Sequence, residues 1–360
     1  VFTDRRLRRT FKKTHQKSIN IFASTRLKEQ EYANDKDLLI DFYNSRGYRN
    51  ATIISDSIYD INEKRIGITI DVSEGNKYYY RNITWVGNSV YPTEALDATL
   101  GIKKGDTYDK KTLHKRLGIG REENPEDNSS IKSNYQNSGY LMSQIDPAEI
   151  IVGADSIDLE LKIFEGKQFS INEVGISGNN RLDDEVIRRE LYTRPGELYN
   201  RSMLMQTIRT LGSMGHFNAE TIMPNIQPVS DELVDISWPL EETPSDQFNI
   251  AGGWGANTFV GSAAITLNNL SIKRFFKKGS WRPYPQGQNQ RLQIGVQTNG
   301  TYYKSASITF TDPWLGGKKP NSLTVGLYWS EENNAYYIWQ SSTKHFRAMG
   351  VTAGIGPVSY

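Results

Sequence analysis

Alternating apolar residues define the final strand of three similar segments. The alternation occupies 66–72, 157–163 and 234–240, and a glutamate follows each run, at Glu74, Glu165 and Glu242. A period of two places the apolar side chains on one face of an extended chain, which is the pattern of a half-buried β-strand. The pattern therefore predicts three copies of one structural unit in the first two thirds of the chain.

Two different spacings relate the second copy to the third. Gly87 corresponds to Gly178, 91 positions later. Gly139 corresponds to Gly215, only 76 positions later, so the second copy contains 15 additional residues. The polar and acidic stretch 118–130 is the expected place of this insertion, and its composition predicts a loop.

Each copy is expected to fold as strand, helix, helix, strand, strand, with both helices on one face of a three-stranded sheet. The first helix is predicted at 93–100 in the second copy and at 183–191 in the third. The predicted α+β modules are 1–77, which lacks its first strand, 78–167, which carries the acidic loop insertion, and 168–244. Edge strands are expected at 51–58, 141–151 and 223–228. Such an edge either binds an extended segment by strand addition or stays idle.

After residue 244, helical periodicity disappears and strands of about ten residues begin. Apolar residues alternate with small or polar ones at 247–255, 261–270, 292–296, 304–310, 323–329 and 349–355. Long strands with one apolar face are typical of a transmembrane β-barrel, although a soluble β-sandwich gives similar alternation. Because usual outer-membrane barrels have eight strands or more, the pattern predicts an incomplete all-β transmembrane antiparallel barrel at 245–360.

Composition and charge narrow the classes of function. The 360 residues have a net charge of +2 and a mean hydropathy of −0.59, and no run approaches the roughly 18 apolar residues of a spanning helix. The near-neutral charge gives no case for a nucleic acid partner. The chain has no cysteine and four scattered histidines, so we expect no metal site, no cofactor and no enzyme activity. Val1 opens no signal peptide, which suggests an internal fragment or a mature protein without its beginning.

The repeated units resemble POTRA (polypeptide-transport-associated) domains. The second and third copies have a Gly-Asn turn, at 87–88 and 178–179, and the second has an Asn-Ser-Gly-Tyr motif at 137–140. Residues 248–255 (FNIAGGWG) resemble the first barrel strand of the BamA family. Residues 310–315 (FTDPWL) resemble the turn after the fourth strand of that family. The order and spacing of these motifs carry the resemblance along the whole chain. The linker 277–290 is longer than in many family members.

This resemblance implies an outer-membrane assembly factor that folds and inserts other β-barrel proteins without nucleotide hydrolysis. The implied location is the outer membrane of a Gram-negative bacterium, with the POTRA domains in the periplasm. The implied partners are unfolded outer-membrane β-barrel proteins, accessory assembly lipoproteins on the POTRA domains, and outer-membrane lipid. In the family, the first and last barrel strands pair weakly and open as a lateral gate. The resemblance assigns the first strand of the gate to Phe248, Asn249, Ile250, Ala251, Gly252, Gly253, Trp254 and Gly255, and a periplasmic turn to Asp312, Pro313 and Trp314.

Three glycines in this strand, Gly252, Gly253 and Gly255, suggest a physical basis for the gate. Glycine offers no side chain to pack and costs more entropy to order, so it weakens the pairing that a gate has to break. A competing interpretation is that the glycines relieve crowding in a curved barrel wall.

Two other functions are consistent with the pattern. One is a two-partner-type outer-membrane secretion transporter, and the other is a soluble β-rich binding module. The presence of at least three repeats favours the assembly factor over the transporter. Aromatic residues near strand ends are expected either in a membrane-interface belt or as anchors inside turns, namely Trp281, Tyr284, Trp314, Trp329, Tyr336, Tyr337 and Trp339.

Overall fold

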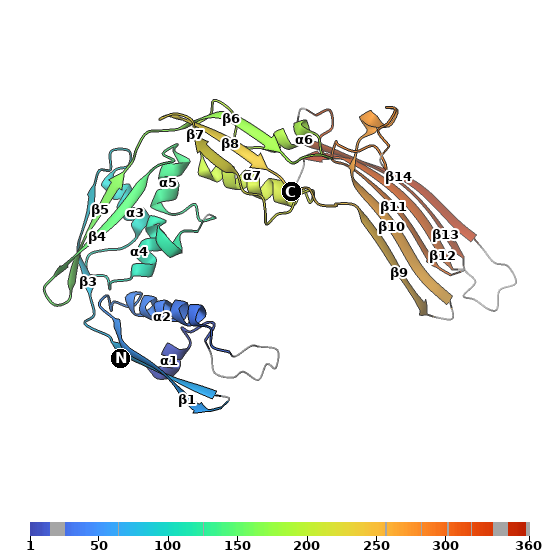
Figure 1. Cartoon of the computed structure of the whole chain (residues 1–360). Coiled ribbons are helices and arrows are strands. Elements are labelled where there is room, and N and C mark those ends of the chain that lie inside the picture. Colours follow the sequence, from blue (N-terminus) through green and yellow to red (C-terminus); the bar gives the residue numbers. More distant parts are fainter. Residues whose placement is uncertain are drawn as a thin grey trace. The chain divides into compact units, whose positions relative to one another are not determined.

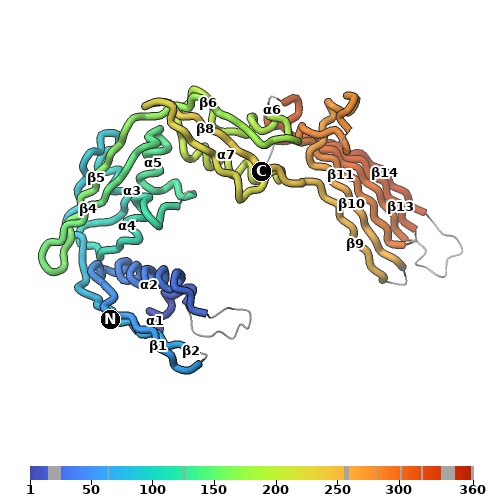
Figure 2. Tube along the Cα trace, viewed as in Figure 1, coloured from blue at the N-terminus to red at the C-terminus, as the bar shows by residue number. Residues whose placement is uncertain are grey.

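The computed structural model describes residues 1–14, 26–63, 65–124, 126–255, 258–281, 283–300, 302–317, 319–333 and 345–357. The chain divides into two compact units: Val1–Ser170 with Leu198–Ser202, and Ile171–Glu197 with Met203–Tyr360. Figures 1 and 2 show the course of the chain within each unit. Among the described residues, no helix has both the length and the apolar character needed to cross a membrane.

The first unit contains the first two repeats. Its elements are α1 (Asp4–Arg8), α2 (Glu29–Asn44), β1 (Thr52–Asn62), β2 (Arg65–Ser73), β3 (Tyr79–Val86), α3 (Thr93–Leu100), α4 (Lys110–Leu117), η1 (Gly120–Glu122), α5 (Ile131–Asn137), β4 (Gln144–Val152) and β5 (Ser156–Phe164). Strands β1 and β2 form an antiparallel pair, and the second repeat has a sheet of order β3-β5-β4. Strand β3 runs parallel to β5, whereas β4 runs antiparallel to it.

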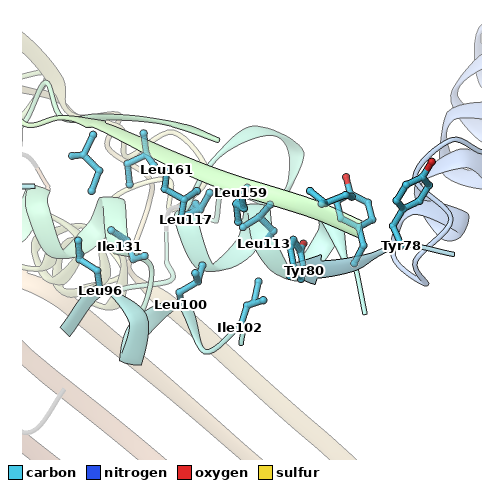
Figure 3. Packing of buried hydrophobic residues seen from close by; sticks show 14 of the residues in the cluster. Tyr78, Tyr80, Leu96, Leu100, Ile102, Leu113, Leu117, Ile131, Leu159 and Leu161 are labelled. Atoms are coloured by element: carbon cyan, nitrogen blue, oxygen red, sulfur yellow. The ribbon is translucent and has the colours of Figure 1, made fainter. Parts of the chain in front are cut away.

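Leucines from the helices meet leucines from the central strand in the core of the second repeat (Figure 3). Leu100 of α3, Leu113 of α4, and Leu159 and Leu161 of β5 are each 1% exposed or less. Burial alternates along β5, so the predicted half-buried strand is confirmed. Each buried leucine of this kind contributes about 1.5–3 kcal/mol to folding.

The expectation of two helices per repeat is wrong for the second repeat, which has three. The third repeat has one continuous helix, α7 (Arg201–Ser213), where the second repeat has α4 and α5 with 118–130 between them. Gly118, at φ 79°, ends α4 in the left-handed conformation. The Ser130 side chain then accepts a hydrogen bond from the Ser133 amide at 3.2 Å and starts α5. The insertion thus divides one helix into two, and it contains both the residue that ends α4 and the residue that begins α5.

The insertion is held by ion pairs within the first unit. Arg121 in η1 lies 2.9 Å from Asp37 and 3.4 Å from Asp41, both on α2. Lys132 pairs with Glu123 at 2.8 Å. The pairs that involve Arg121 are largely exposed, so each contributes little to stability. They join the insertion of the second repeat to the helix of the first.

In the second and third repeats, the glutamate after the last strand binds backbone amides in the turn after the first strand. Glu165 accepts backbone hydrogen bonds from Ser89 and Val90 at 2.8 and 2.9 Å. Glu242 does the same in the third repeat, where the Arg181 amide donates at 2.9 Å. Burial raises the pKa of Glu165, and the hydrogen bonds from Ser89, Val90 and Tyr135 together lower it by more, so its pKa lies below the ordinary value. The carboxylate therefore ties the last strand of a repeat to the turn that follows its first strand.

The second unit begins with most of the third repeat. Its elements are β6 (Ser170–Ser177), α6 (Asp184–Arg188), α7, β7 (Asn225–Pro228) and β8 (Leu233–Pro239), with a sheet of order β6-β8-β7. Helix α6 is shorter than the predicted 183–191. The amides of Glu190 and Leu191 donate hydrogen bonds to the carbonyls of Ile187 and Arg188, three residues earlier. These bonds form a tighter turn than the α-helix, so the α-helix ends before residue 191.

A six-stranded antiparallel sheet completes the second unit. Its strands are β9 (Gln247–Gly255), β10 (Thr258–Leu270), β11 (Gln290–Asn299), β12 (Tyr303–Asp312), β13 (Asn321–Asn333) and β14 (His345–Pro357), and a short 3-10 turn, η2 (Ile272–Arg274), follows β10. The order is β14-β13-β12-β11-β10-β9, so each strand pairs with its neighbour in sequence. All six predicted strands are present. Within the described residues the sheet is open, and β9 and β14 are its edges.

Candidate functional site at the edge of the sheet

Strand β9 contains all eight residues predicted for the gate, and it is an edge strand. It pairs with β10 along its whole length, from Gln247 opposite Thr266 to Gly255 opposite Thr258. Its other side has no neighbouring strand among the described residues. Ile250 and Trp254 are 70% and 78% exposed. The edge therefore presents backbone donors and acceptors that another strand can pair with.

The glycines of β9 lie in two different environments. Gly252 lies opposite Gly261 of β10, and a Cβ on Gly252 would lie 3.2 Å from the Phe259 ring. A Cβ on Gly253 would meet no heavy atom within 4 Å. Gly252 therefore lies in tight contact with the Phe259 ring, whereas nothing crowds Gly253. At Gly253, glycine weakens the strand, because it offers no side chain for packing and its backbone loses more entropy when the strand becomes ordered.

One face of the sheet is apolar across all six strands. The register aligns Phe248, Ile265, Ile294, Ile308, Leu327 and Val351 in one row. The adjacent row on the opposite face is small or polar except at Tyr328, and consists of Asn249, Ala264, Gly295, Ser307, Tyr328 and Gly350. The apolar row is 40–72% exposed. Soluble monomers rarely leave so extended an apolar surface in water, so this face marks a contact with lipid or protein.

The predicted turn at Asp312, Pro313 and Trp314 follows β12 and contacts the third repeat. The Asp312 side chain accepts a hydrogen bond from the Trp314 amide at 3.0 Å, which fixes the turn. Trp314 Nε1 donates to the buried carboxylate of Glu190 at 2.6 Å. The Arg189 guanidinium lies 4.9 Å from the centre of the Trp314 ring. Trp314 is therefore a packing anchor inside a turn.

The connection between β10 and β11 binds the third repeat through a polar network. Asp183, just before α6, accepts hydrogen bonds from Arg274 at 2.7 Å and from Gln288 at 2.6 Å. The Asp183 amide donates to the Gly287 carbonyl at 3.0 Å. A Cβ on Gly287 would lie 2.6 Å from the Asp183 carboxylate, so only glycine fits this close approach.

His216 is buried at the same junction. Its Nδ1 lies 3.0 Å from the Ser245 hydroxyl, and its Nε2 lies 2.6 Å from the Asn289 side-chain oxygen. Burial lowers the pKa of His216, and the Asn289 hydrogen bond offsets this only in part. The imidazole is therefore neutral near pH 7, with the proton on Nε2, where it is donated to Asn289. Ser245 lies two residues before β9, so this contact fixes the point at which the edge strand begins.

The pocket beside His216, Arg181 and Glu242 is small. It measures about 10 Å³, which is room for about one water molecule. Among the described residues, no cluster of His, Asp and Glu is arranged to hold a metal ion. The chemistry at this end of the sheet is hydrogen bonding and ion pairing between two folded parts.

The aromatic residues considered for an interface belt fall into two groups. Tyr284 is buried and donates to Asp246 at 2.7 Å, so it is an anchor like Trp314. Trp281 is 54% exposed, and Trp329 is half-buried next to the apolar row. Tyr336, Tyr337 and Trp339 lie outside the described residues.

Sequence reasoning missed the junction between the third repeat and the sheet. Its partners are far apart in the chain, as Trp314 and Glu190 are, at 124 positions. Two signals were available. The amide-rich run 286–290 (QGQNQ) precedes an alternating strand, and His216 replaces the aromatic residue that the second repeat has at Tyr140.

The comparisons with known proteins agree with this architecture. A family model described as "POTRA: Surface antigen variable number repeat" matches residues 1–75, 78–166 and 169–242. The three repeats thus define a POTRA-containing protein. These matches cover more than half of the chain, so the chain belongs to the POTRA family.

Curated relatives match most of this chain. The outer membrane protein assembly factor BamA of Neisseria meningitidis serogroup B is 25% identical over 364 residues, which cover 99% of this chain and 41% of that protein. BamA of Neorickettsia risticii is 23% identical over 273 residues, 75% of this chain and 35% of that protein. The chain therefore spans less than half the length of these relatives.

Solved structures show the same fold. BamA from Haemophilus ducreyi lacking POTRA domains 1-3 matches with a TM-score of 0.58 at 17% identity, over 77% of this chain and 47% of that one. Haemophilus influenzae BamA POTRA3-5 matches with a TM-score of 0.53 at 19% identity, over 67% of this chain and 91% of that one.

Proposed function

We propose that this chain is part of an outer-membrane assembly factor that folds and inserts β-barrel proteins through a lateral gate at β9. The modules 1–77, 78–167 and 168–244 serve as a periplasmic docking platform, and 245–360 supplies the first six strands of a transmembrane barrel. The apolar row across all six strands carries this proposal, because a barrel wall in lipid requires an apolar outer face and a polar or small inner face.

The partners follow from this role. Unfolded outer-membrane β-barrel proteins are the substrates, accessory assembly lipoproteins bind the POTRA domains, and outer-membrane lipid surrounds the sheet. An exposed β-strand edge binds an extended segment through main-chain hydrogen bonds, so insertion at β9 requires neither a cofactor nor a covalent step.

The geometry of β9 supports a strand that is fixed at one end and open along its length. The contact between His216 and Ser245 holds the chain just before β9. Beyond that point, β9 has only β10 as a neighbour among the described residues. Because Gly253 offers no side chain, a strand paired with the free edge of β9 makes fewer packing contacts there. That pairing is therefore easier to break and to replace.

The barrel part of the proposal is tested by gel mobility. The full-length protein, folded in detergent, should migrate faster without boiling than after boiling, because a closed membrane barrel stays compact in detergent until heated. A parallel sample of a known soluble β-sandwich serves as the control. Equal mobility before and after boiling would favour the soluble β-rich binding module.

Depletion tests the assembly function itself. An assembly factor is needed by many outer-membrane proteins, whereas a two-partner-type secretion transporter serves one dedicated substrate. Loss of the protein should therefore lower many different barrel proteins together.

A further inference from the structure

The connection between β10 and β11 combines exposed aromatic rings with basic side chains. We refer to residues 271–285 as the basic–aromatic loop; Figure 1 draws it in orange at the end of the sheet beside α6. The loop contains no aspartate or glutamate and five basic residues, Lys273, Arg274, Lys277, Lys278 and Arg282. Its base takes part in the junction with the third repeat, whereas its tip serves neither the junction nor the gate.

The rings at the tip pack on one another and stay exposed to solvent. The Phe275 ring lies 5.3 Å from that of Phe276 and 5.0 Å from that of Trp281, both edge to face. Phe276 is 95% exposed and Trp281 is 54% exposed. Trp281 Nε1 donates to the Phe275 carbonyl at 3.0 Å, so the tip is held in one shape. A shaped apolar tip without a covering partner marks an interaction surface.

The base of the loop is anchored, and this leaves the lysines free for other contacts. The Arg274 guanidinium is occupied by Asp183 at 2.7 Å and by the Gln286 carbonyl at 2.8 Å. Tyr284 donates to Asp246 at 2.7 Å. Among the residues that the structure describes, no ion pair engages the exposed ammonium groups of Lys273, Lys277 and Lys278.

The loop begins where the apolar face of the sheet ends. Leu267 and Leu292 form the apolar pair of β10 and β11 nearest this end, and the loop starts four residues after Leu267. In membrane barrels, aromatic residues gather where the apolar band meets water. Lysines at that level are attracted to anionic headgroups. The apolar strand therefore leads into a segment in which aromatic rings and unpaired lysines are interleaved, and both residue types are favoured at a membrane surface.

We propose that the basic–aromatic loop binds anionic phospholipid at the membrane surface. The Phe275, Phe276 and Trp281 rings enter the headgroup region, and the three unpaired lysines contact lipid phosphates. The inference rests on the proposed membrane location of the sheet. Charge complementarity indicates an anionic partner, and continuity with the apolar face favours a lipid surface over an acidic protein.

A single fluorescent label can locate the tip, because this chain has no cysteine of its own. The full-length protein, freed of any other cysteine, is labelled with bimane at Phe276→Cys, at Val351→Cys on the apolar face, or at Ser230→Cys in an exposed turn of the third repeat. Each protein is placed in lipid nanodiscs of phosphatidylcholine, with or without phosphatidylglycerol. Quenching by doxyl-labelled lipid and by aqueous iodide is then compared.

We expect doxyl lipid to quench the labels at Phe276→Cys and Val351→Cys, and iodide to quench the label at Ser230→Cys. Quenching at Phe276→Cys should increase with phosphatidylglycerol. The combined changes Lys273→Gln, Lys277→Gln and Lys278→Gln should raise the phosphatidylglycerol fraction for half-maximal quenching several-fold. The control changes Lys12→Gln, Lys103→Gln and Lys104→Gln, in the first two repeats, should leave it unchanged.

The outcomes separate this inference from the proposed function. If Val351→Cys is quenched by doxyl lipid but Phe276→Cys is quenched only by iodide, the sheet is in the membrane and the loop does not bind lipid. Protection of Phe276→Cys from both quenchers would mean that protein covers the tip, which also overturns the inference. Failure of doxyl lipid to quench Val351→Cys would contradict the membrane location of the sheet itself.

Discussion

A disulfide between β9 and the last strand of the full-length barrel should stop the assembly of other β-barrel proteins. We place one cysteine at Ala251→Cys, which lies opposite Ser262 on the polar face of β10, and the other at the facing position of the last strand. A substrate strand can displace the hydrogen bonds between these two strands, but it cannot displace a covalent disulfide. Growth should fail when the disulfide forms and should return when a reductant is added.

The matched control cross-links two strands that stay paired in the proposed mechanism. Gln297 and Ser305 lie directly opposite each other on β11 and β12, so cysteines at these positions constrain the sheet without touching its free edge. This variant should grow normally in oxidising and reducing conditions. Normal growth with the β9 seam fully cross-linked would contradict the gate.

The change Gly178→Ala should unfold the third repeat. Gly178 follows β6 at φ 87°, and a Cβ there would lie 2.0 Å from the Leu240 carbonyl oxygen. The substitution combines a strained backbone with a clash against the Leu240 backbone just after β8, which cannot move away cheaply, so we expect a loss of at least about 3 kcal/mol. Hydrogen exchange of the β8 amides in the intact protein measures this loss.

Gly196 is the control for backbone strain alone. It has φ 86°, almost the same as Gly178, but a Cβ there would meet no heavy atom within 4 Å. Gly196→Ala should therefore cost only about 1–2 kcal/mol, the penalty of a left-handed alanine. Equal destabilisation by the two changes would show that the approach to Leu240 is not what requires glycine at position 178.

The strands could be predicted from the sequence because burial on one face imposes a period of two. This holds for β5, whose buried residues begin at Ile157. In the six strands of the sheet the same period comes from one apolar face, which is exposed within the described chain. The internal repeat also predicted helix α3 at its observed bounds and located the insertion. It did not show that the insertion divides a helix, because the capping roles of Gly118 and Ser130 depend on backbone conformation.

The contacts behind the edge strand could not be predicted, because they join residues that no local pattern links. Asp183 binds Arg274 across 91 positions, and Trp314 reaches Glu190 across 124. Trp314 illustrates the limit. Its sequence context fits a membrane belt and a turn anchor equally well, and only the position of the buried Glu190 carboxylate distinguishes the two.

Depletion of this protein in its native cell tests the central claim most directly. Outer-membrane fractions are collected as the protein disappears, and the amounts of many unrelated β-barrel proteins are measured by quantitative mass spectrometry, with outer-membrane lipoproteins as the internal control. The proposed function predicts that the barrel proteins decline together while their unfolded forms accumulate in the periplasm. Unchanged barrel proteins, with loss of a single secreted substrate, would contradict it.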